Sequence, residues 1–506
     1  METVTITPTG EATGAIYFDN LSPIRVFGTD SLRGAFGEET LQQARNARLC
    51  PDVTDVVLTP DAHIGFGAPI GCVMVSPSTI YPGPVGVDIN CSMSLLQFEL
   101  PEEALQGEKR FRRSIIQAIE KRVPSGPGTK KLPLARRFPI DLIERALVDG
   151  PVSDVLDAME IPREWTERCE DAFRVGSDGT TNSLGARLEV LKSLLAEKKG
   201  GLKKNYEDKL NQLGSLGGGN HFGECEIVRL TEQEKSALAD EDAPNVSQTF
   251  GLKDGNVAFL THCGSRGFGN LLAREQFALL KRKFELWHIP IPANEPDLVY
   301  APLGTPEAND YIDDMVLAAN FATINHLLIN ALVWDAFQEI IPGVEANLVY
   351  YISHNIARRE VIDDKPVWVH RKGSTRAYPA NHFSLKDTPF AKTGHPILLP
   401  GNPTQGSSVM VALEGAKESC YSVNHGAGRA LGRRKAVQVL DQKTVDEEFN
   451  NADILTNCRF YPKDEAPAAY KDFNEVLRSV ELAGLAREVA RLQARFVIKD
   501  SSTPDD

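Results

Sequence analysis

The segment MVLAANFATINHLLINALVW, residues 315–334, places the strongest constraint on how this chain can fold. Twenty predominantly apolar residues are long enough to cross a bilayer as a helix. Asn320, Asn325, His326 and Asn330 interrupt the segment, and a helix enclosed by protein accounts for them better than a membrane span. Such a helix requires a core that surrounds it, and a chain of 506 residues can supply one.

The rest of the pattern predicts one large α+β domain over residues 1–506. Length alone suggests roughly three domains, but we find no clean linker, internal repeat or low-complexity tract. Apolar runs predict strands at 54–58, 92–100, 256–261, 346–353, 365–370 and 407–413, with a loop-rich segment between the first two. Helical spacing predicts helices at 102–123, 184–204, 309–341 and 473–496. Residues 102–215 are expected to form an approximate helical and basic insertion.

Charge limits the class of protein. The net charge of −14 argues against a protein that coats nucleic acid indiscriminately. Residues 101–140 nevertheless carry ten Lys and Arg against four Asp and Glu. This local excess fits either a basic groove or a solvated helix face.

Cysteine usage and the N-terminus predict a cytoplasmic location and no membrane partner. The eight cysteines are scattered without CxxC pairs, which is typical of a reducing compartment. The N-terminal METVTITPTGEATG has neither the basic start nor the apolar run of a signal peptide.

Several residues of metal-ligand type occur where apolar runs give way to polar turns. His262 and His354 each follow a predicted strand, and His221 ends a glycine run. Asp88 and Cys91 are three residues apart, a spacing that places both side chains on one side of a tight turn. Each residue alone has a plain structural explanation, since an isolated Cys is usually a small buried hydrophobe. Together the five exceed one tetrahedral site, and a shared thiolate would allow two ions, zinc or manganese.

His425 lies in the stretch YSVNHGAGRALGRRKA, residues 421–436. Glycines allow close approach of the backbone to a ligand, and arginines bind phosphate. A strand end that turns into a helix would also explain the stretch. His326, on the long apolar helix, is expected to be structural, and His63 lies in a glycine-rich turn that fits either structure or phosphate binding.

These motifs, taken in order, resemble the RtcB-type RNA ligases, which join RNA ends with GTP and manganese. The resemblance covers nearly the whole chain, and its motifs are TPDAHIGFGAPIGC (59–72), PVGVDINC (84–91), GSLGGGNHFGE (214–224), THCGSRGFGN (261–270), SHNIARRE (353–360), RKGSTRAYP (371–379), NHGAGRALGR (424–433) and FVIKD (496–500). It implies an α+β domain with a central, metal-containing cleft and helical insertions.

The resemblance also implies roles for individual residues. Cys91 would bridge two Mn²⁺ ions, with Asp88 and His221 completing one site and His262 and His354 the other. His425 would be the catalytic residue that becomes guanylylated. The implied GTP contacts are Asn220, Phe222, Glu224, Tyr470, Lys499 and Arg429, with Glu224 at the guanine edge. Arg266 and Arg429 lie in motifs that would meet phosphate.

The implied activity is GTP-dependent ligation of RNA 3′-phosphate or 2′,3′-cyclic phosphate ends to 5′-hydroxyl ends, through a GMP-histidine intermediate and a GMP-capped 3′ end. Implied partners are RNA ends, with DNA ends as an alternative, and an accessory activating protein. The sequence departs from the family at Ser92 and Ser94, where a glycine and an arginine are usual, and in PGNPTQGSS, residues 400–408. A capping enzyme without efficient sealing, a two-metal phosphoesterase and a non-catalytic end-binding subunit are the alternatives.

Overall fold

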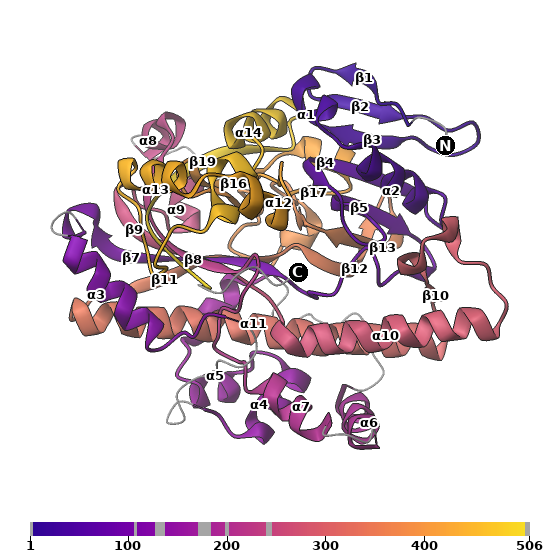
Figure 1. Ribbon diagram of the computed structural model, residues 1–506, viewed down its shortest axis with the longest axis horizontal. Coiled ribbons are helices and arrows are strands. Elements are labelled where there is room, and N and C mark those ends of the chain that lie inside the picture. The colour runs from indigo at the N-terminus through magenta and orange to yellow at the C-terminus, as the bar shows by residue number, and fades with distance from the viewer. Residues whose placement is uncertain are drawn as a thin grey trace.

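The structure is a computed structural model that describes residues 4–105, 109–126, 137–170, 184–197, 202–238 and 245–500. Two mainly antiparallel sheets form its upper part in Figure 1, and helices α10 (Arg266–Leu286) and α11 (Pro306–Ile340) run beneath them. Helices therefore pack against sheets that are mainly antiparallel. The α+β prediction is confirmed.

The first large sheet has seven strands. Its order is β1 (Thr7–Gly10), β2 (Thr13–Ile16), β3 (Ile24–Phe27), β4 (Asp55–His63), β5 (Ile70–Ser76), β13 (Lys365–Lys372) and β12 (Asn355–Ile362). Only β3 and β4 pair in parallel within it. The expected strands at 54–58 and 365–370 are therefore present, whereas β5 occupies part of the segment that we expected to be loop-rich.

The second large sheet has eight strands and carries most of the residues that resemble metal ligands. Its order is β11 (Ala346–Ser353), β7 (Ser92–Pro101), β9 (Asn256–Cys263), β8 (Phe222–Leu230), β19 (Ala486–Lys499), β16 (Gly406–Ala412) and β15 (Pro396–Asn402), and β18 (Leu455–Thr456) pairs with β19 beside this path. Two small ladders complete the strands, namely β14 (Ser374–Arg376) with β17 (Ser422–Asn424) and β10 (Ala301–Pro302) with β6 (Thr79–Ile80). All four strands predicted in this part of the sequence are confirmed.

Helix α11 is the buried helix predicted from the apolar segment. Among the described helices it alone is long and apolar enough to cross a membrane, but the window that meets this test is 100% buried inside the protein. Two of the asparagines that interrupt the apolar segment have partners there: Asn320 donates to the Leu147 carbonyl, and the Asn325 carbonyl oxygen accepts from the Gly214 amide. Pro306 at the first turn and the Thr305 side chain, which accepts from the Ala308 amide, begin the helix.

The region 102–215 is helical where the structure describes it. After a short 3-10 helix at Glu102–Ala104 it contains α3 (Lys109–Glu120), α4 (Ile140–Asp149), α5 (Ser153–Ala158), α6 (Leu184–Glu197) and α7 (Leu202–Leu210), and α4 to α7 lie below α11 in Figure 1. Arg112 pairs with Asp453 and Arg122 with Glu339, so part of the basic excess joins α3 to the rest of the fold. Lys130, Lys131 and Arg136 lie outside the described residues.

The predicted helix at 473–496 is wrong in its second half. Helix α14 ends at Leu482, and Gly484 has a left-handed backbone (φ +67°) that stops it. The residues that follow form β19, which pairs with β8 on one side and β16 on the other. Two neighbouring strands satisfy its backbone, and this pairing overrides the helical spacing of its side chains.

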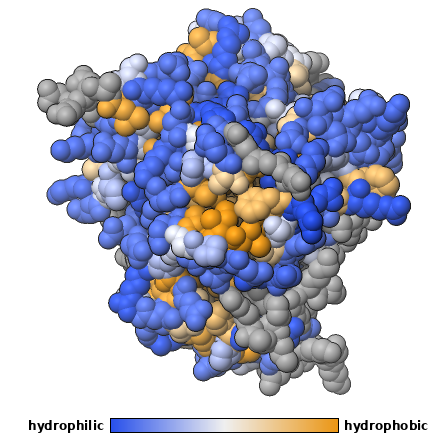
Figure 2. All heavy atoms as spheres, turned by 90° about the vertical axis from the view of Figure 1, so that its left-hand side faces the viewer, coloured by the Kyte–Doolittle hydropathy of each residue, from blue (hydrophilic) through white to orange (hydrophobic). Residues whose placement is uncertain are grey.

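The remaining helices cover the sheets. They are α1 (Asp30–Gly34), α2 (Glu38–Arg48), α8 (Glu232–Leu238), α9 (Val246–Phe250), α12 (Arg433–Val439), α13 (Gln442–Asn451) and α14 (Phe473–Leu482). The face shown in Figure 2, the left-hand side of Figure 1, is mainly hydrophilic, with apolar side chains gathered near its middle. The long apolar segments lie in the interior instead, as in α11.

Candidate active site

Adjacent ends of four strands bring the predicted metal ligands together. Cys91 directly precedes β7 and His221 directly precedes β8, whereas His262 is near the end of β9 and His354 follows β11. The register places His262 opposite both Met93 of β7 and Phe222 of β8. Antiparallel pairing therefore brings together residues that are far apart in the sequence: Cys91 and His354, 263 positions apart, meet at adjacent strand ends.

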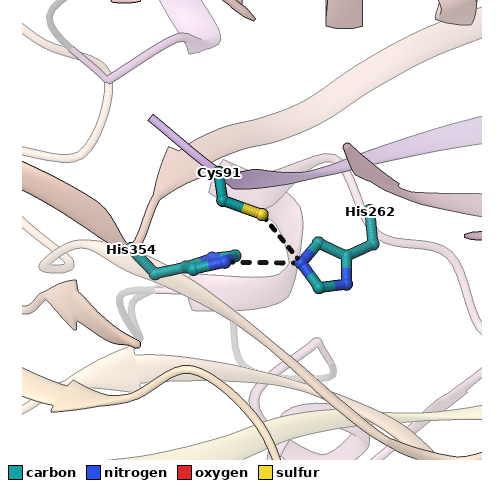
Figure 3. A group of neighbouring side chains, drawn as sticks. All are labelled: Cys91, His262 and His354. Atoms are coloured by element: carbon teal, nitrogen blue, oxygen red, sulfur yellow. Dashed lines mark hydrogen bonds between the residues drawn. The ribbon is translucent and has the colours of Figure 1, made fainter. Parts of the chain in front are cut away.

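Cys91, His262 and His354 form the first compact group (Figure 3). The Cys91 Sγ atom is 3.2 Å from His262 Nε2, which is 3.3 Å from His354 Nε2. All three residues are buried, and their donor atoms converge on one point between the side chains.

Asp88, Cys91 and His221 form the second group, which shares Cys91 with the first. His221 Nε2 is 2.9 Å from Asp88 Oδ2 and 3.6 Å from Cys91 Sγ. His221 Nδ1 faces the Leu216 carbonyl at 3.0 Å, so a proton on Nδ1 leaves the lone pair of Nε2 available to a metal ion. The spacing of Asp88 and Cys91 does place both side chains on one side of their turn.

The backbone holds this turn in place. Asn90 has a left-handed conformation (φ 57°), and its amide donates to the Asn355 carbonyl at 2.7 Å. The His354 amide donates to the Cys91 carbonyl at 2.9 Å, which ties the two ligand-bearing segments together directly. A Cβ at Gly264 would lie 2.7 Å from Asp88 Oδ1, so only glycine permits this approach.

The donor set fits a pair of divalent metal ions. Around an ion with bonds of roughly 2.0–2.3 Å, tetrahedrally arranged donors lie about 3.5 Å apart, close to the distances in both groups. Burial and the neighbouring positive charges lower the pKa of His262 and His354 well below the usual value, which keeps both imidazoles neutral. Burial and the Asp88 charge raise the pKa of the Cys91 thiol, and a shared dication would offset this cost.

His425 lies beside the first group and is held by Asp61. Its ring centroid is 4.9 Å from that of His354. His425 Nδ1 is 2.7 Å from Asp61 Oδ2, and the His425 amide donates to the same oxygen at 3.2 Å. Burial raises the pKa of Asp61, but the hydrogen bond and charge of His425 bring it below the usual value. A carboxylate only accepts, so Nδ1 carries the proton and Nε2 has the free lone pair.

Asp61 was not assigned any role from the sequence, although it lies two residues before His63 in a glycine-rich motif. Lys471 holds its backbone in place by donating through Nζ to the Pro60 and Ala62 carbonyls at 3.1 and 2.7 Å. The Lys471 amide also donates to the Gly428 carbonyl at 3.0 Å. One buried lysine thus connects the Asp61 segment with the turn that carries His425.

Four of the six expected nucleotide contacts line a single pocket, namely Phe222, Glu224, Tyr470 and Lys499. The Phe222 ring also packs edge-on against His262, with centroids 5.4 Å apart, so the pocket adjoins the first metal group. Burial, together with the charges of Glu226 and Glu465, raises the pKa of Glu224 well above its usual value. A buried carboxyl group thus lies next to an aromatic ring, as a site for a planar heterocycle requires.

The other expected contacts lie outside the lining of this pocket. Asn220 is exposed, and its Nδ2 is 4.0 Å from Cys91 Sγ, which places it toward the metal groups. The Arg429 guanidinium lies 4.9 Å from the centre of the Tyr470 ring and donates to the Leu431 and Asp464 carbonyls. Arg266 has a left-handed backbone (φ 55°) and a guanidinium 3.5 Å from His221 Nδ1. Asn220 and Arg266 thus lie beside the groups of ligand-type residues, and Arg429 lies beside Tyr470 of the pocket.

Glu465 organises the pocket and was missed in the sequence. Its carboxylate accepts from Tyr470, from Lys499 at 2.7 Å and from Arg433 at 2.8 Å. Burial would raise its pKa, but the charges of Lys499 and Arg433 lower it strongly. Lys499 also donates to the Gly219 carbonyl at 2.8 Å, so this network joins the C-terminal strand to the glycine run. In the sequence, its position in the motif KDEAPAAY, five residues before Tyr470, could have indicated a role in the pocket.

The departures at Ser92 and Ser94 lie in the core below the metal groups. The Ser92 hydroxyl bonds the Asn90 carbonyl and lies 3.0 Å from the Tyr351 hydroxyl. The Ser94 hydroxyl is 2.9 Å from Nδ1 of His326 on α11. Both serines are fully buried, and so is His326, for which we expect a structural role. Both serines therefore contact residues of the core, and neither belongs to the two groups of ligand-type residues.

The departure at residues 400–408 forms the β15–β16 hairpin beside the pocket. The Asn402 side chain accepts hydrogen bonds from Thr404 and Gln405 and so closes the hairpin on itself. Gly401 and Pro403 line the pocket. The hairpin thus contributes backbone and a proline ring to the lining of the pocket.

Comparisons with known proteins agree with this geometry. The model of the family described as tRNA-splicing ligase RtcB matches residues 43–500. The tRNA-splicing ligase RtcB of Pyrobaculum aerophilum is 32% identical over 496 residues, which is 94% of either chain. The proteins of the same name from Thermococcus kodakarensis and Nanoarchaeum equitans are 31% and 32% identical over 94% of this chain. With its motifs, ligand groups and nearly full-length match all in agreement, this chain belongs to the RtcB family.

Proposed function

We propose that this protein is a cytoplasmic, GTP-dependent RNA ligase that joins 3′-phosphate or 2′,3′-cyclic phosphate ends to 5′-hydroxyl ends. The observation that carries this proposal is the His425–Asp61 pair, which lies against the first metal group. A histidine with an oriented, unprotonated Nε2 beside a cluster of metal ligands is suited to attack phosphorus. The family membership supports the same reaction class.

Two Mn²⁺ ions would be held by the two groups, with Cys91 shared between them. Asp88 and His221 would complete one site, and His262 and His354 the other. Bound there, the ions would supply positive charge to a nearby phosphate. Cys91 is well placed for this shared role because its Sγ atom faces His221 and His262 at 3.6 and 3.2 Å.

His425 would act as the nucleophile toward GTP. Nε2 attacks the α-phosphorus, a P–N bond forms, and the bond to the departing pyrophosphate breaks. Asp61 keeps the proton on Nδ1 and stabilises the positive charge that develops on the ring. Gly373 permits this arrangement, since a Cβ at its left-handed position would lie 3.1 Å from His425 Cε1.

The pocket would bind the guanine. Glu224 would accept from the guanine N–H groups, and Phe222 and Tyr470 would contact the ring system. Asn220, Arg266 and Arg429 would lie along the triphosphate, between the pocket and the metal groups. Lys499 would be positioned for the nucleotide by Glu465.

The GMP would then pass from His425 to the RNA 3′-phosphate, forming a capped end and freeing the histidine. Attack by the 5′-hydroxyl would release GMP and form the phosphodiester, while a 2′,3′-cyclic phosphate would first be hydrolysed. The buried position of Ser92 and Ser94 favours sealing over capping alone, because neither substitution reaches the cleft.

Labelling with α-³²P-GTP and Mn²⁺ tests the first step. Wild type should acquire a covalent label that is acid-labile and base-stable, as expected of a P–N bond. His425→Ala should acquire none and still bind metal, whereas the control His382→Ala, at a half-exposed histidine in another loop, should label normally. Label that persists in His425→Ala would identify a different nucleophile.

Supplying RNA with a 3′-phosphate and RNA with a 5′-hydroxyl tests the second step. A joined strand is the expected product. Accumulation of a GMP-capped 3′ end without joining would support the capping enzyme instead, and phosphate release without any label would support the phosphoesterase. Matching DNA ends in parallel reactions show whether the 2′-hydroxyl is needed.

A further inference from the structure

We propose that the outer face of α10, together with Phe66 on the β4–β5 loop, binds a single strand of RNA that leads away from the active site. We call this surface the α10 track and define it by Arg266, Asn270, Arg274, Phe277, Lys281 and Phe66. The proposal deepens the proposed function, on which the identity of the strand as an RNA end rests. It assigns a path to nucleotides beyond the reacting phosphate.

The track begins at the active site because α10 begins there. Arg266 is the first residue of the helix and has a left-handed backbone, a conformation that is costly for arginine and is concentrated at functional sites. Its Nε donates to the Ser215 hydroxyl at 3.3 Å, and its guanidinium lies 3.5 Å from His221 Nδ1. A phosphate at the metal groups is therefore next to the first cation of the helix.

Helical spacing continues this side of α10 outward. Positions 266, 270, 274, 277 and 281 recur at intervals of three and four, so they share one face. At 1.5 Å per residue, Arg274 lies roughly 12 Å and Lys281 roughly 22 Å along the helix from Arg266. With about 3.4 Å between phosphates in a stacked strand, these cations correspond to about the fourth and the seventh nucleotide.

Arg274 is the cation best suited to a phosphate. It is exposed, and its Nε donates to the Asn270 side-chain oxygen at 2.9 Å, which orients the guanidinium along the helix. Within the described part of the chain no carboxylate forms an ion pair with Arg274, whereas Lys281 pairs with Asp297 at 2.8 Å. Arginine in this state offers several N–H donors to phosphate oxygens.

Phe66 supplies an aromatic platform on the facing loop. Its side chain is 76% exposed, yet its backbone is fixed, since its carbonyl accepts from the Lys372 ammonium and from the Ala68 amide at 2.8 Å. The Gln43 side chain accepts from the amide of the neighbouring Gly65 at 3.0 Å and donates to the Gly65 carbonyl at 2.7 Å. A rigid, exposed ring of this kind can stack with any base.

The loop and the helix are linked on both sides. Asp297 pairs with Lys281 of α10, and a Cβ at Gly67, next to Phe66, would lie 2.9 Å from the Asp297 side chain. On the other side, the Lys372 ammonium donates to the Phe66 carbonyl. The next residue, Gly373, packs closely against the ring of His425. Phe66 and α10 therefore flank the same approach to the active site.

Charge favours a polyanion as the occupant. Helix α10 carries five Lys and Arg against two Glu, in a chain whose net charge is −14. A concentration of cations on an otherwise acidic protein, continuous with a phosphate-handling site and provided with an aromatic platform, matches single-stranded nucleic acid.

Fluorescence anisotropy with the full-length protein tests the helix. The probes are a 12-nucleotide and a 3-nucleotide single-stranded RNA, each with a 3′-phosphate, measured across a range of salt concentrations. Arg274→Gln should weaken binding of the longer RNA roughly 3- to 10-fold and reduce the salt slope by about 0.7, the value for one phosphate contact on a single strand. Binding of the 3-nucleotide RNA, too short to reach Arg274, should not change.

Arg282→Gln is the matched control, because Arg282 is exposed on the same helix but turned away from the track. It should leave both affinities and the salt slope at wild-type values. Equal losses in the two variants would overturn the proposal, since they would reflect net charge alone. The same holds if Arg274→Gln weakens the short and the long RNA equally.

Phe66 is tested with RNA that carries 2-aminopurine at successive positions. Stacking quenches this base, so wild type should quench one position, Phe66→Ala should lose the quenching with a roughly 5- to 50-fold weaker affinity, and Phe66→Trp should restore both. Quenching that survives in Phe66→Ala would exclude the platform. GTP labelling of wild type, scored separately, reports on the proposed function and does not enter these binding comparisons.

Discussion

At the scale of single residues, the pairing of His425 with Asp61 would make an ordinary imidazole a directed nucleophile in the proposed reaction. Asp61 has no exposed surface, and its other carboxylate oxygen accepts from the Thr59 hydroxyl at 2.5 Å. The carboxylate is thus immobile, and it sets both the tautomer and the orientation of the ring. Asp61 would act as a positioning residue, since its side chain hydrogen-bonds to His425 and Thr59.

Asp61→Asn should slow GMP transfer to His425 by roughly 10²- to 10⁴-fold, because the amide no longer enforces the Nδ1–H tautomer or stabilises a positive ring. Metal content and melting temperature should stay close to wild type. Thr59→Val, which removes only the second hydrogen bond, should cost less than tenfold. Single-turnover labelling with α-³²P-GTP measures both, and a similar rate in Asp61→Asn and wild type would refute the role.

Glu226 is a buried carboxyl group whose pKa is raised by its surroundings. It lies on β8 two positions beyond Glu224, is fully buried, and neither of its oxygens forms a hydrogen bond of normal geometry among the described residues. Burial raises the pKa of Glu226 to about 8, against a smaller opposite effect of the Ser407 hydroxyl. The folded protein therefore keeps a proton on Glu226 that the unfolded chain loses near its ordinary pKa of 4.5.

Glu226→Gln should stabilise the protein at alkaline pH. Between pH 4.5 and about 8 the folded state binds more protons at this group than the unfolded state, so wild-type stability falls as pH rises. Glutamine does not ionise, so the variant avoids this loss of unfolding free energy, which is on the order of a few kcal/mol at pH 8 and vanishes below about pH 4.5. Melting temperatures from pH 4.5 to 8.5 measure it, with exposed Glu448→Gln as the control. A pH-independent difference would contradict the assignment.

At the scale of secondary-structure elements, a buried ion pair joins the helical region to α11. Arg187 of α6 donates from Nε and a terminal nitrogen to the two carboxylate oxygens of Asp314, at 2.7 and 2.9 Å. Burial raises the pKa of Asp314 even though the arginine opposes the change. Gln276 of α10 donates to the same carboxylate, so three helices meet at one charge.

Arg187→Met should destabilise the protein by about 3–5 kcal/mol, because it leaves the Asp314 carboxylate buried without its partner. The double variant Arg187→Met/Asp314→Leu should recover a substantial part of this loss, since the buried carboxylate is removed with its partner and Asp310, the other ion-pair partner of Arg187, is exposed to solvent. Urea unfolding followed by fluorescence measures both. A double variant as unstable as the single one would show that lost packing of α6, and not the unpaired buried carboxylate of Asp314, is responsible.

At the scale of the whole molecule, two sheets together build the candidate active site. Asp61 comes from the seven-stranded sheet, the metal groups from the edge of the eight-stranded sheet, and His425 from the small ladder of β14 and β17 between them. Metal bound by the two groups of ligand-type residues would therefore stabilise the folded state of the whole molecule.

Adding Mn²⁺ to metal-free protein should raise the melting temperature, with about 2.7 kcal/mol gained at a free concentration 100 times the dissociation constant. Cys91→Ala should abolish most of this rise and lower the bound content of both ions, because it removes a ligand from each site. Cys225→Ala, at a buried cysteine of β8 outside both groups, is the control and should keep the response. Elemental analysis showing two ions in Cys91→Ala would refute the shared ligand.

The sequence by itself determined those features that depend on local pattern. Residues 346–353 were predicted as a strand with the bounds that the structure shows, and the polar positions of 315–334 identified a buried helix. The five ligand-type residues were recognisable because each lies at the junction between an apolar strand and a polar turn. Periodicity and residue chemistry are properties of a short stretch, so a short stretch reveals them.

Only the tertiary structure decided which residues act together. Asp61 and His425 are 364 positions apart, and no local pattern couples them. Glu465 became meaningful through Lys499, Tyr470 and Arg433, which come from separate segments. Likewise β19 is a strand because β8 and β16 pair with its backbone, although its side chains have helical spacing. Such pairings are set by the free energy of the whole fold, in which backbone hydrogen bonds and burial between distant segments outweigh local preference.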